Sequence, residues 1–278
     1  MAFSLDSITR GRRLRPPRII IVGREKVGKS TFAAGAPSPI FIPIKGEEGI
    51  DAMDVARFPS IENYGQLVQA LRVLFESPHE FGSVAIDSIS ALEPLVMAEA
   101  RRIEGVDNDA KLGGGYGNQD NTPMKLWAEI CAWLDALRDS RDMTTILIGH
   151  AEIARSAEPD VESFDTYTLA LRKKARAILY RWSDAILYAT TITAVVKEAA
   201  GFGGKSRSRG IGTDGRVLRT QARPTHPGGG RGVFGHLPYE LPLDWASYQA
   251  AIAAAHATAG GDTEQTDTRA DETEHAEQ

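Results

Sequence analysis

A glycine-rich loop between an apolar run and a helix start constrains this chain more than any other feature. Residues 19–22 are all apolar, and the sequence GREKVGKS follows directly and leads into TFAA. This is the pattern G-x-x-x-x-G-K-S, whose glycines turn backbone N–H groups toward a phosphate at a helix N-terminus. The sequence therefore predicts a nucleoside triphosphate site, formed by Gly23, Arg24, Glu25, Lys26, Val27, Gly28, Lys29, Ser30 and Thr31.

Two side chains of this loop and one distant acid predict the chemistry of the site. Lys29 is expected to reach the β- and γ-phosphates, and the Ser30 hydroxyl to bind Mg²⁺. Residues 83–88 form an apolar run that ends in an acid and a hydroxyl, which predicts a buried strand. Asp87 at its end would hold Mg²⁺ through water, as in other phosphate-loop proteins. The alternative is that Asp87 only forms a turn.

Composition narrows the class of protein. The 278 residues are 42% hydrophobic, which is ample for one large α/β domain with appendages. Cys131 is the single cysteine, so an internal disulfide is excluded. No apolar run approaches the ~20 residues of a membrane span, and the start lacks the apolar segment of a signal peptide. We therefore expect a protein of the cytoplasm, of a cell or of an infected one, without a membrane partner.

Charge divides the chain into three expected parts: a basic flexible arm (1–16), an α/β core (17–257) and a disordered acidic tail (258–278). The net charge is −5, but from residue 260 onward seven acids face a single arginine. Basic residues gather in the arm and between residues 205 and 231. Such localised positive charge is compatible with a nucleic-acid partner, although ordinary solvated loops would also explain it.

The order of these segments resembles the RecA-type ATPase core, and more closely the small phage RecA-like proteins that act as single-strand annealing ATPases. The most discriminating stretch is FIPIKGEEGID (41–51), followed by the strand that ends at Asp87 and by a later strand that ends in Gly149 and His150. The resemblance covers roughly residues 17–250. It implies a mostly parallel central sheet flanked by helices, and Mg²⁺ and ATP as cofactors.

The same resemblance suggests catalytic residues. Glu47 is the first choice for the general base that orients the attacking water, and Glu48 is the second; the alternative is a solvated acidic loop. His150 matches the position of a polar γ-phosphate sensor, where RecA itself has glutamine. A histidine after a buried strand is otherwise often structural.

Two long connections match the family's DNA-binding loops. Residues 105–121 are too glycine-rich to predict regular structure, and residues 151–167 form a second polar connection. Tyr116, Phe164 and Tyr167 could stack on bases, or only support the local fold. The DNA-binding candidates are Lys111, Tyr116, Lys205, Arg207 and Arg209, and the candidates for acting on a neighbouring subunit's nucleotide are Arg223 and Arg231.

The resemblance therefore implies an ATPase that binds single-stranded DNA and promotes annealing or recombination. ATP would stabilise a homo-oligomer, either a filament or a ring, with a single-strand-binding protein as a further partner. One alternative is a replicative helicase or helicase loader on the same core. Another is a non-catalytic module in which the nucleotide only supports assembly.

Overall fold

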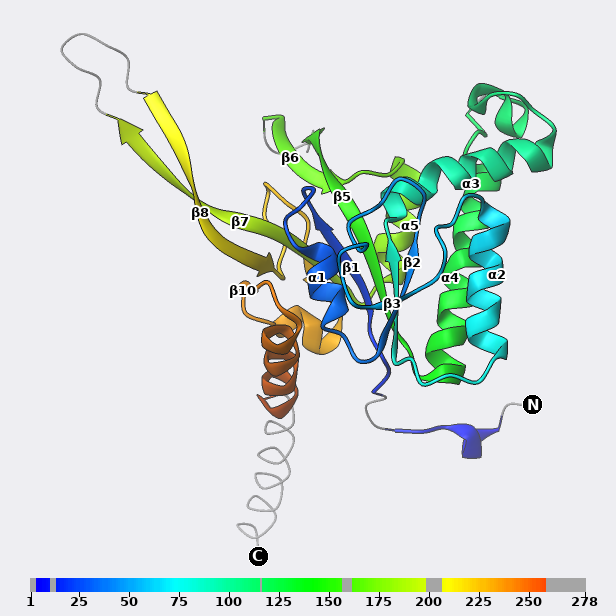
Figure 1. The fold of residues 1–278 in the computed structure, drawn as a ribbon, viewed down its shortest axis with the longest axis horizontal. Helices are drawn as coiled ribbons and strands as arrows, with labels where there is room; N and C mark the ends of the chain where they lie inside the picture. Colours follow the sequence, from blue (N-terminus) through cyan, green and yellow to red (C-terminus); the bar gives the residue numbers. More distant parts are fainter. Residues whose placement is uncertain (1–3, 11–13, 116, 157–161, 199–206, 259–278) are drawn as a thin grey trace, which may run out of the picture.

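The computed structural model describes residues 4–10, 14–115, 117–156, 162–198 and 207–258 (Figure 1). In this part of the chain, ten strands form one sheet in the order β10-β8-β7-β1-β5-β4-β2-β3, with β6 paired to β5 and β9 to β7. The six strands from β7 to β3 are parallel, and the other pairs are antiparallel. The strands are β1 (Arg18–Gly23), β2 (Pro39–Pro43), β3 (Ala56–Arg57), β4 (Ser83–Asp87), β5 (Thr144–Ser156), β6 (Phe164–Leu169), β7 (Ala185–Glu198), β8 (Arg207–Arg219), β9 (Gly229–Gly230) and β10 (Glu240–Pro242).

Helices cover both faces of the sheet (Figure 1). Successive side chains of a strand point to opposite faces, so Ile20 and Val22 of β1 pack on one side and Ile19 and Ile21 on the other. The first side carries α2 (Tyr64–Glu76), α3 (Ile89–Glu104), α4 (Asn121–Arg141) and α5 (Lys173–Trp182), and the second carries α1 (Lys29–Ala34) and a last helix over residues 245–258. The expected α/β fold, a mostly parallel sheet flanked by helices, is confirmed.

No helix of the described residues combines the length and apolar character needed to cross a bilayer. The described residues also form three short 3-10 helices, η1 (Leu5–Ser7), η2 (Asp109–Gly114) and η3 (Gly232–His236).

Both long connections contain more regular structure than the sequence predicts. Within residues 105–121, η2 is fixed by Leu112, which is fully buried in the core. The second connection is largely a hairpin, because β5 continues to Ser156 and β6 returns antiparallel from Phe164. The glycine content and the polar composition gave no sign of either feature. Burial of one leucine and pairing between two strands are effects of the folded context that local propensity does not report.

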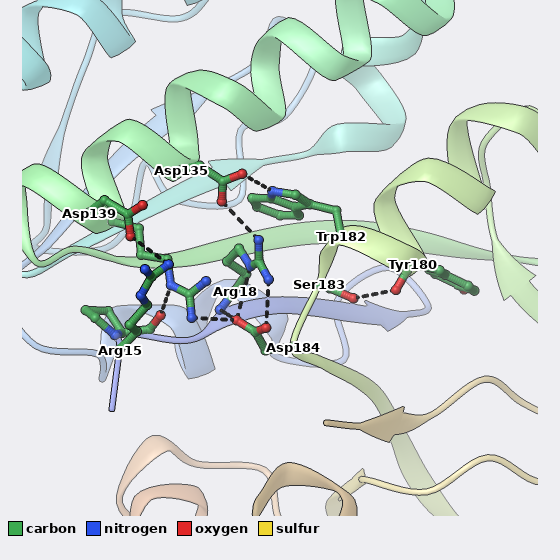
Figure 2. A network of polar contacts seen from close by, with 10 residues as sticks. Arg15, Arg18, Asp135, Asp139, Tyr180, Trp182, Ser183 and Asp184 are labelled. Atoms are coloured by element: carbon green, nitrogen blue, oxygen red, sulfur yellow. Dashed lines mark hydrogen bonds and ion pairs between the residues drawn. The ribbon is translucent and has the colours of Figure 1, made fainter. Parts of the chain in front are cut away.

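A buried ion-pair network joins the amino-terminal ends of β1 and β7 (Figure 2). The Arg18 guanidinium donates to Asp184 at 2.8 Å and to Asp135 at 3.0 Å, and Asp135 also accepts from the Trp182 indole. Arg138 lies 3.2 Å from the same Asp184 carboxylate. Burial alone would raise the pKa of Asp184, but the hydrogen bonds and charge of Arg18 outweigh it, so the pKa lies below its usual value.

We expect Asp184→Asn to destabilise the fold by about 3 kcal/mol, because Asp184 is buried and its loss leaves two partly buried arginines undercompensated. Asp139→Asn is the matched control, since its pair with Arg15 is more exposed and is worth less than about 1 kcal/mol. Because the pKa of Asp184 is depressed, its contribution is present above the unfolded pKa of about 3.9 and is lost as the pH falls through the folded value. Urea unfolding at several pH values measures both effects. Equal losses from the two variants near neutral pH would contradict the assignment.

Candidate nucleotide site

The glycine-rich loop (residues 23–28) connects β1 to the start of α1, as the motif predicts. Gly28 has φ +114°, a backbone conformation that favours glycine. Gly23 has no room for a side chain, because a Cβ there would lie 2.5 Å from the Ala189 carbonyl oxygen. These two glycines let the loop turn tightly beside β7 and open onto the N-terminus of α1, where backbone N–H groups favour an anion.

Lys29 lies across the inside of this loop. Its side chain is almost fully buried, and Nζ donates to the carbonyl oxygens of Gly23 at 2.9 Å and Arg24 at 2.7 Å. Burial lowers the pKa of the Lys29 ammonium, while the carboxylates of Asp87 and Glu25 act in the opposite direction. The ammonium is therefore held by the loop at the helix N-terminus, as a phosphate-binding lysine requires.

Asp87 and Ser30 are in contact although β5 lies between their parts of the sheet. Asp87 ends β4, and Ser30 lies in α1, which follows β1. The Ser30 hydroxyl donates to Asp87 Oδ2 at 2.6 Å. Burial raises the pKa of Asp87, and the hydrogen bond from Ser30 opposes that shift. A hydroxyl and a carboxylate are hard oxygen donors of the kind that hold Mg²⁺ together with waters and phosphates. The pair therefore fits the predicted Mg²⁺ site.

Glu47 is the centre of a second polar cluster beside this pair. Its Oε1 lies 2.6 Å from His150 Nε2 and accepts from the Ser88 hydroxyl at 2.6 Å. The hydrogen bond with His150 lowers the pKa of Glu47; burial acts against it, and the Ser88 bond adds to it. Glu47 is thus held as a carboxylate by Ser88, which follows β4, and by His150 within β5.

Ser88 was not among the predicted site residues. It is fully buried and also caps α3, since its hydroxyl accepts from the Ala91 N–H at 3.1 Å. The sequence signal was the hydroxyl after the acid at the end of β4. Contact with Glu47 depends on the loop after β2, which local pattern does not reveal.

The two acids of the sequence GEEG have different surroundings. Glu48 is exposed, and among the described residues its side chain makes no hydrogen bond or ion pair. Glu25, in the phosphate loop, is 70% exposed and approaches His150 Nδ1 at 3.6 Å. Of the remaining loop residues, Val27 is buried, and Arg24, Lys26 and Thr31 are exposed.

The proposed DNA-binding and trans-acting residues lie apart from this cluster. Lys111 pairs with Asp107 at 2.8 Å on an exposed turn. Arg207 and Arg209 lie on β8, in register with Glu198 and Val196 of β7. Tyr116 and Lys205 fall outside the described residues.

Arg223 and Arg231 lie in different places. The Arg223 guanidinium is 4.6 Å from the centre of the Tyr239 ring. The Arg231 N–H donates to the Asp184 carbonyl at 2.8 Å, at the amino-terminal end of the sheet. This is the end away from the phosphate loop, so Arg231 cannot reach the nucleotide site of its own chain.

Family comparison agrees with this geometry. The model of the AAA domain family matches residues 15–232, so the chain belongs to that family. Fold, loop and family together define the class as an AAA-type P-loop ATPase domain. A search of curated proteins found no match.

Proposed function

We propose that this chain is a RecA-like, ATP-dependent protein that binds single-stranded DNA and promotes annealing or recombination as a nucleotide-gated oligomer. The observation that carries the proposal is the position of His150. It contacts Glu47 in the site, and it lies on β5, which continues without a break into the hairpin with β6. A change at the nucleotide would thereby be transmitted to a projecting surface element.

In the proposed reaction, Lys29 and the loop N–H groups hold the phosphates of ATP. Glu47 accepts a proton from a water aligned with the γ-phosphate, the water oxygen bonds to phosphorus, and ADP leaves. Ser30 and Asp87 would hold Mg²⁺, which neutralises charge on the phosphate oxygens when bound. His150 orients the Glu47 carboxylate through Nε2 and responds to the γ-phosphate.

Annealing of two complementary labelled oligonucleotides tests the proposed function. We expect the protein with Mg²⁺-ATP to accelerate pairing more than the protein with Mg²⁺-ADP. Equal rates with and without protein in both nucleotide states would contradict it. ATP-driven separation of a duplex would favour the helicase alternative instead.

Ser88 provides a further test of the assigned base. Removing its hydroxyl in Ser88→Ala takes one hydrogen bond from the Glu47 carboxylate, and a bond to a charged group is worth about 1.5–3 kcal/mol. We expect turnover to fall roughly tenfold. The acidic limb of the pH profile should move to higher pH, because the lost bond had lowered the pKa of Glu47.

The matched control is Asn63→Ala. Asn63 caps α2 by accepting from the Gln66 N–H, so this variant loses a helix cap that makes no contact with Glu47. If both variants lower turnover equally and neither shifts the pH profile, Ser88 acts only as a cap.

A further inference from the structure

A polar pocket borders the phosphate loop, and residues 24–27 of the loop form part of its lining. Its volume is about 590 Å³, and its lining includes Arg24 and Lys26 of the loop, Tyr167 of β6, Tyr188 of β7 and Arg219 of β8. Parallel strands β5 and β7 both run outward from the same edge of the sheet, and each continues into a hairpin (Figure 1). The pocket therefore lies between the bases of these two hairpins.

The pocket carries a net positive charge. Arg24, Lys26 and Arg219 face a single acid of the lining, Glu25, whose side chain is 70% exposed. Arg219 Nε also lies 3.5 Å from a carboxylate oxygen of Glu240, a residue that does not line the pocket. Three cations against one acid in a cavity of this size favour an anionic ligand.

Aromatic rings hold the two guanidinium groups of the pocket. Arg24 lies 5.2 Å from the centre of the Tyr167 ring and donates to its hydroxyl, and Arg219 lies 5.7 Å from the centre of the Tyr239 ring. Such contacts limit the rotamers of long side chains. The pocket thus presents two positioned forks, the geometry that matches phosphate oxygens.

The Tyr167 ring already contacts neighbouring side chains. Tyr167 stacks on Tyr188 at 5.6 Å, and Tyr188 stacks on His226 at 4.8 Å. Arg24 also lies over the Tyr167 ring. Stacking of Tyr167 on bases stays a prediction. The cations of the pocket suit a phosphate group.

We propose that this pocket binds the sugar-phosphate backbone of single-stranded DNA as the strand passes between the two hairpins; this inference rests on the proposed function. Arg24 then serves both ligands of the protein. Its carbonyl oxygen accepts from Lys29 Nζ inside the nucleotide loop, and Arg24 is also among the residues that line the pocket. DNA binding and ATP binding are coupled through this one residue.

Arg219→Ala tests the pocket, with Arg72→Ala as the matched control. Both residues place a guanidinium on an aromatic ring at a similar distance, 5.7 Å for Arg219 on Tyr239 and 5.8 Å for Arg72 on Trp133, but Arg72 lies on α2, away from the pocket. The measurement is fluorescence anisotropy of a labelled oligothymidylate with Mg²⁺-ATP, over about 50 to about 200 mM salt.

We expect Arg219→Ala to weaken binding about tenfold, since a charge-assisted contact is lost. The plot of log affinity against log salt concentration should become shallower, with the magnitude of its negative slope smaller by about 0.7. Arg219→Lys, which keeps the charge, should recover most of the slope, and Arg72→Ala should match the wild type.

Two results would overturn the inference, and they are distinguishable. If the wild type binds the oligonucleotide and Arg219→Ala binds it as Arg72→Ala does, the pocket is not the DNA site and the proposed function stands. If the wild type binds no single-stranded DNA, the proposed function fails as well. Thermal unfolding of each variant verifies that the comparison is between folded proteins.

Discussion

Glu47→Gln is expected to lower ATP turnover by about 10²- to 10⁴-fold, the usual contribution of a general base. The amide retains the shape of the side chain and can still contact Ser88 and His150, so the fold and nucleotide affinity should change little. What is lost is the carboxylate that accepts the proton from water. Steady-state phosphate release and binding of a fluorescent ATP analogue measure the two quantities separately.

Glu48→Gln is the natural control for this experiment. It makes the same chemical change at the adjacent residue, but Glu48 is exposed and makes no side-chain hydrogen bond in the described part of the chain. We expect its turnover to stay near that of the wild type. If Glu47→Gln hydrolyses ATP normally while Glu48→Gln does not, the first and second choices for the base are reversed.

Lys29→Ala should weaken nucleotide binding strongly and abolish turnover. The Lys29 ammonium is buried and held by two carbonyl groups of the loop, so no other described lysine can replace it at the helix N-terminus. Loss of charge-assisted bonds worth about 1.5–3 kcal/mol each predicts an ATP affinity weaker by roughly 100-fold.

Lys45→Ala controls for the loss of one positive charge, since Lys45 is 66% exposed and pairs only weakly with Glu62. Its ATP affinity should equal that of the wild type. Titration of each variant with a fluorescent nucleotide measures these affinities. A Lys29→Ala protein that binds ATP with wild-type affinity would disprove the role assigned to the loop.

Much of the fold follows from short stretches of sequence. The apolar runs at β1, β4 and β5 are long enough to predict buried strands. The polar residues that follow each run indicate where the buried part of the strand ends. The β5–β6 hairpin could not be predicted in the same way. β6 has a mixed polar sequence, and what makes it a strand is its antiparallel pairing with β5.

In the candidate site, too, some residues could be predicted from the sequence and others could not. Lys29 and Ser30 belong to a local motif. Asp87 ends β4, Glu47 follows β2, and His150 lies where β5 leaves the buried part of the parallel sheet, so all three lie at the same end of that sheet. The structure brings these side chains together, and their roles remain predictions. Ser88 and Arg219 were not singled out as site residues, because the contacts that give them a place in a site are made with residues elsewhere in the sequence. No local pattern distinguishes them from other serines and arginines.

The most direct test of the central claim is the rate of ATP hydrolysis with and without a single-stranded oligonucleotide, measured for the wild type and Lys29→Ala. We predict that DNA stimulates the wild type and that the variant shows no turnover in either condition. Wild-type turnover that is indifferent to DNA would contradict a DNA-gated ATPase and would favour the helicase-loader or assembly-module alternatives.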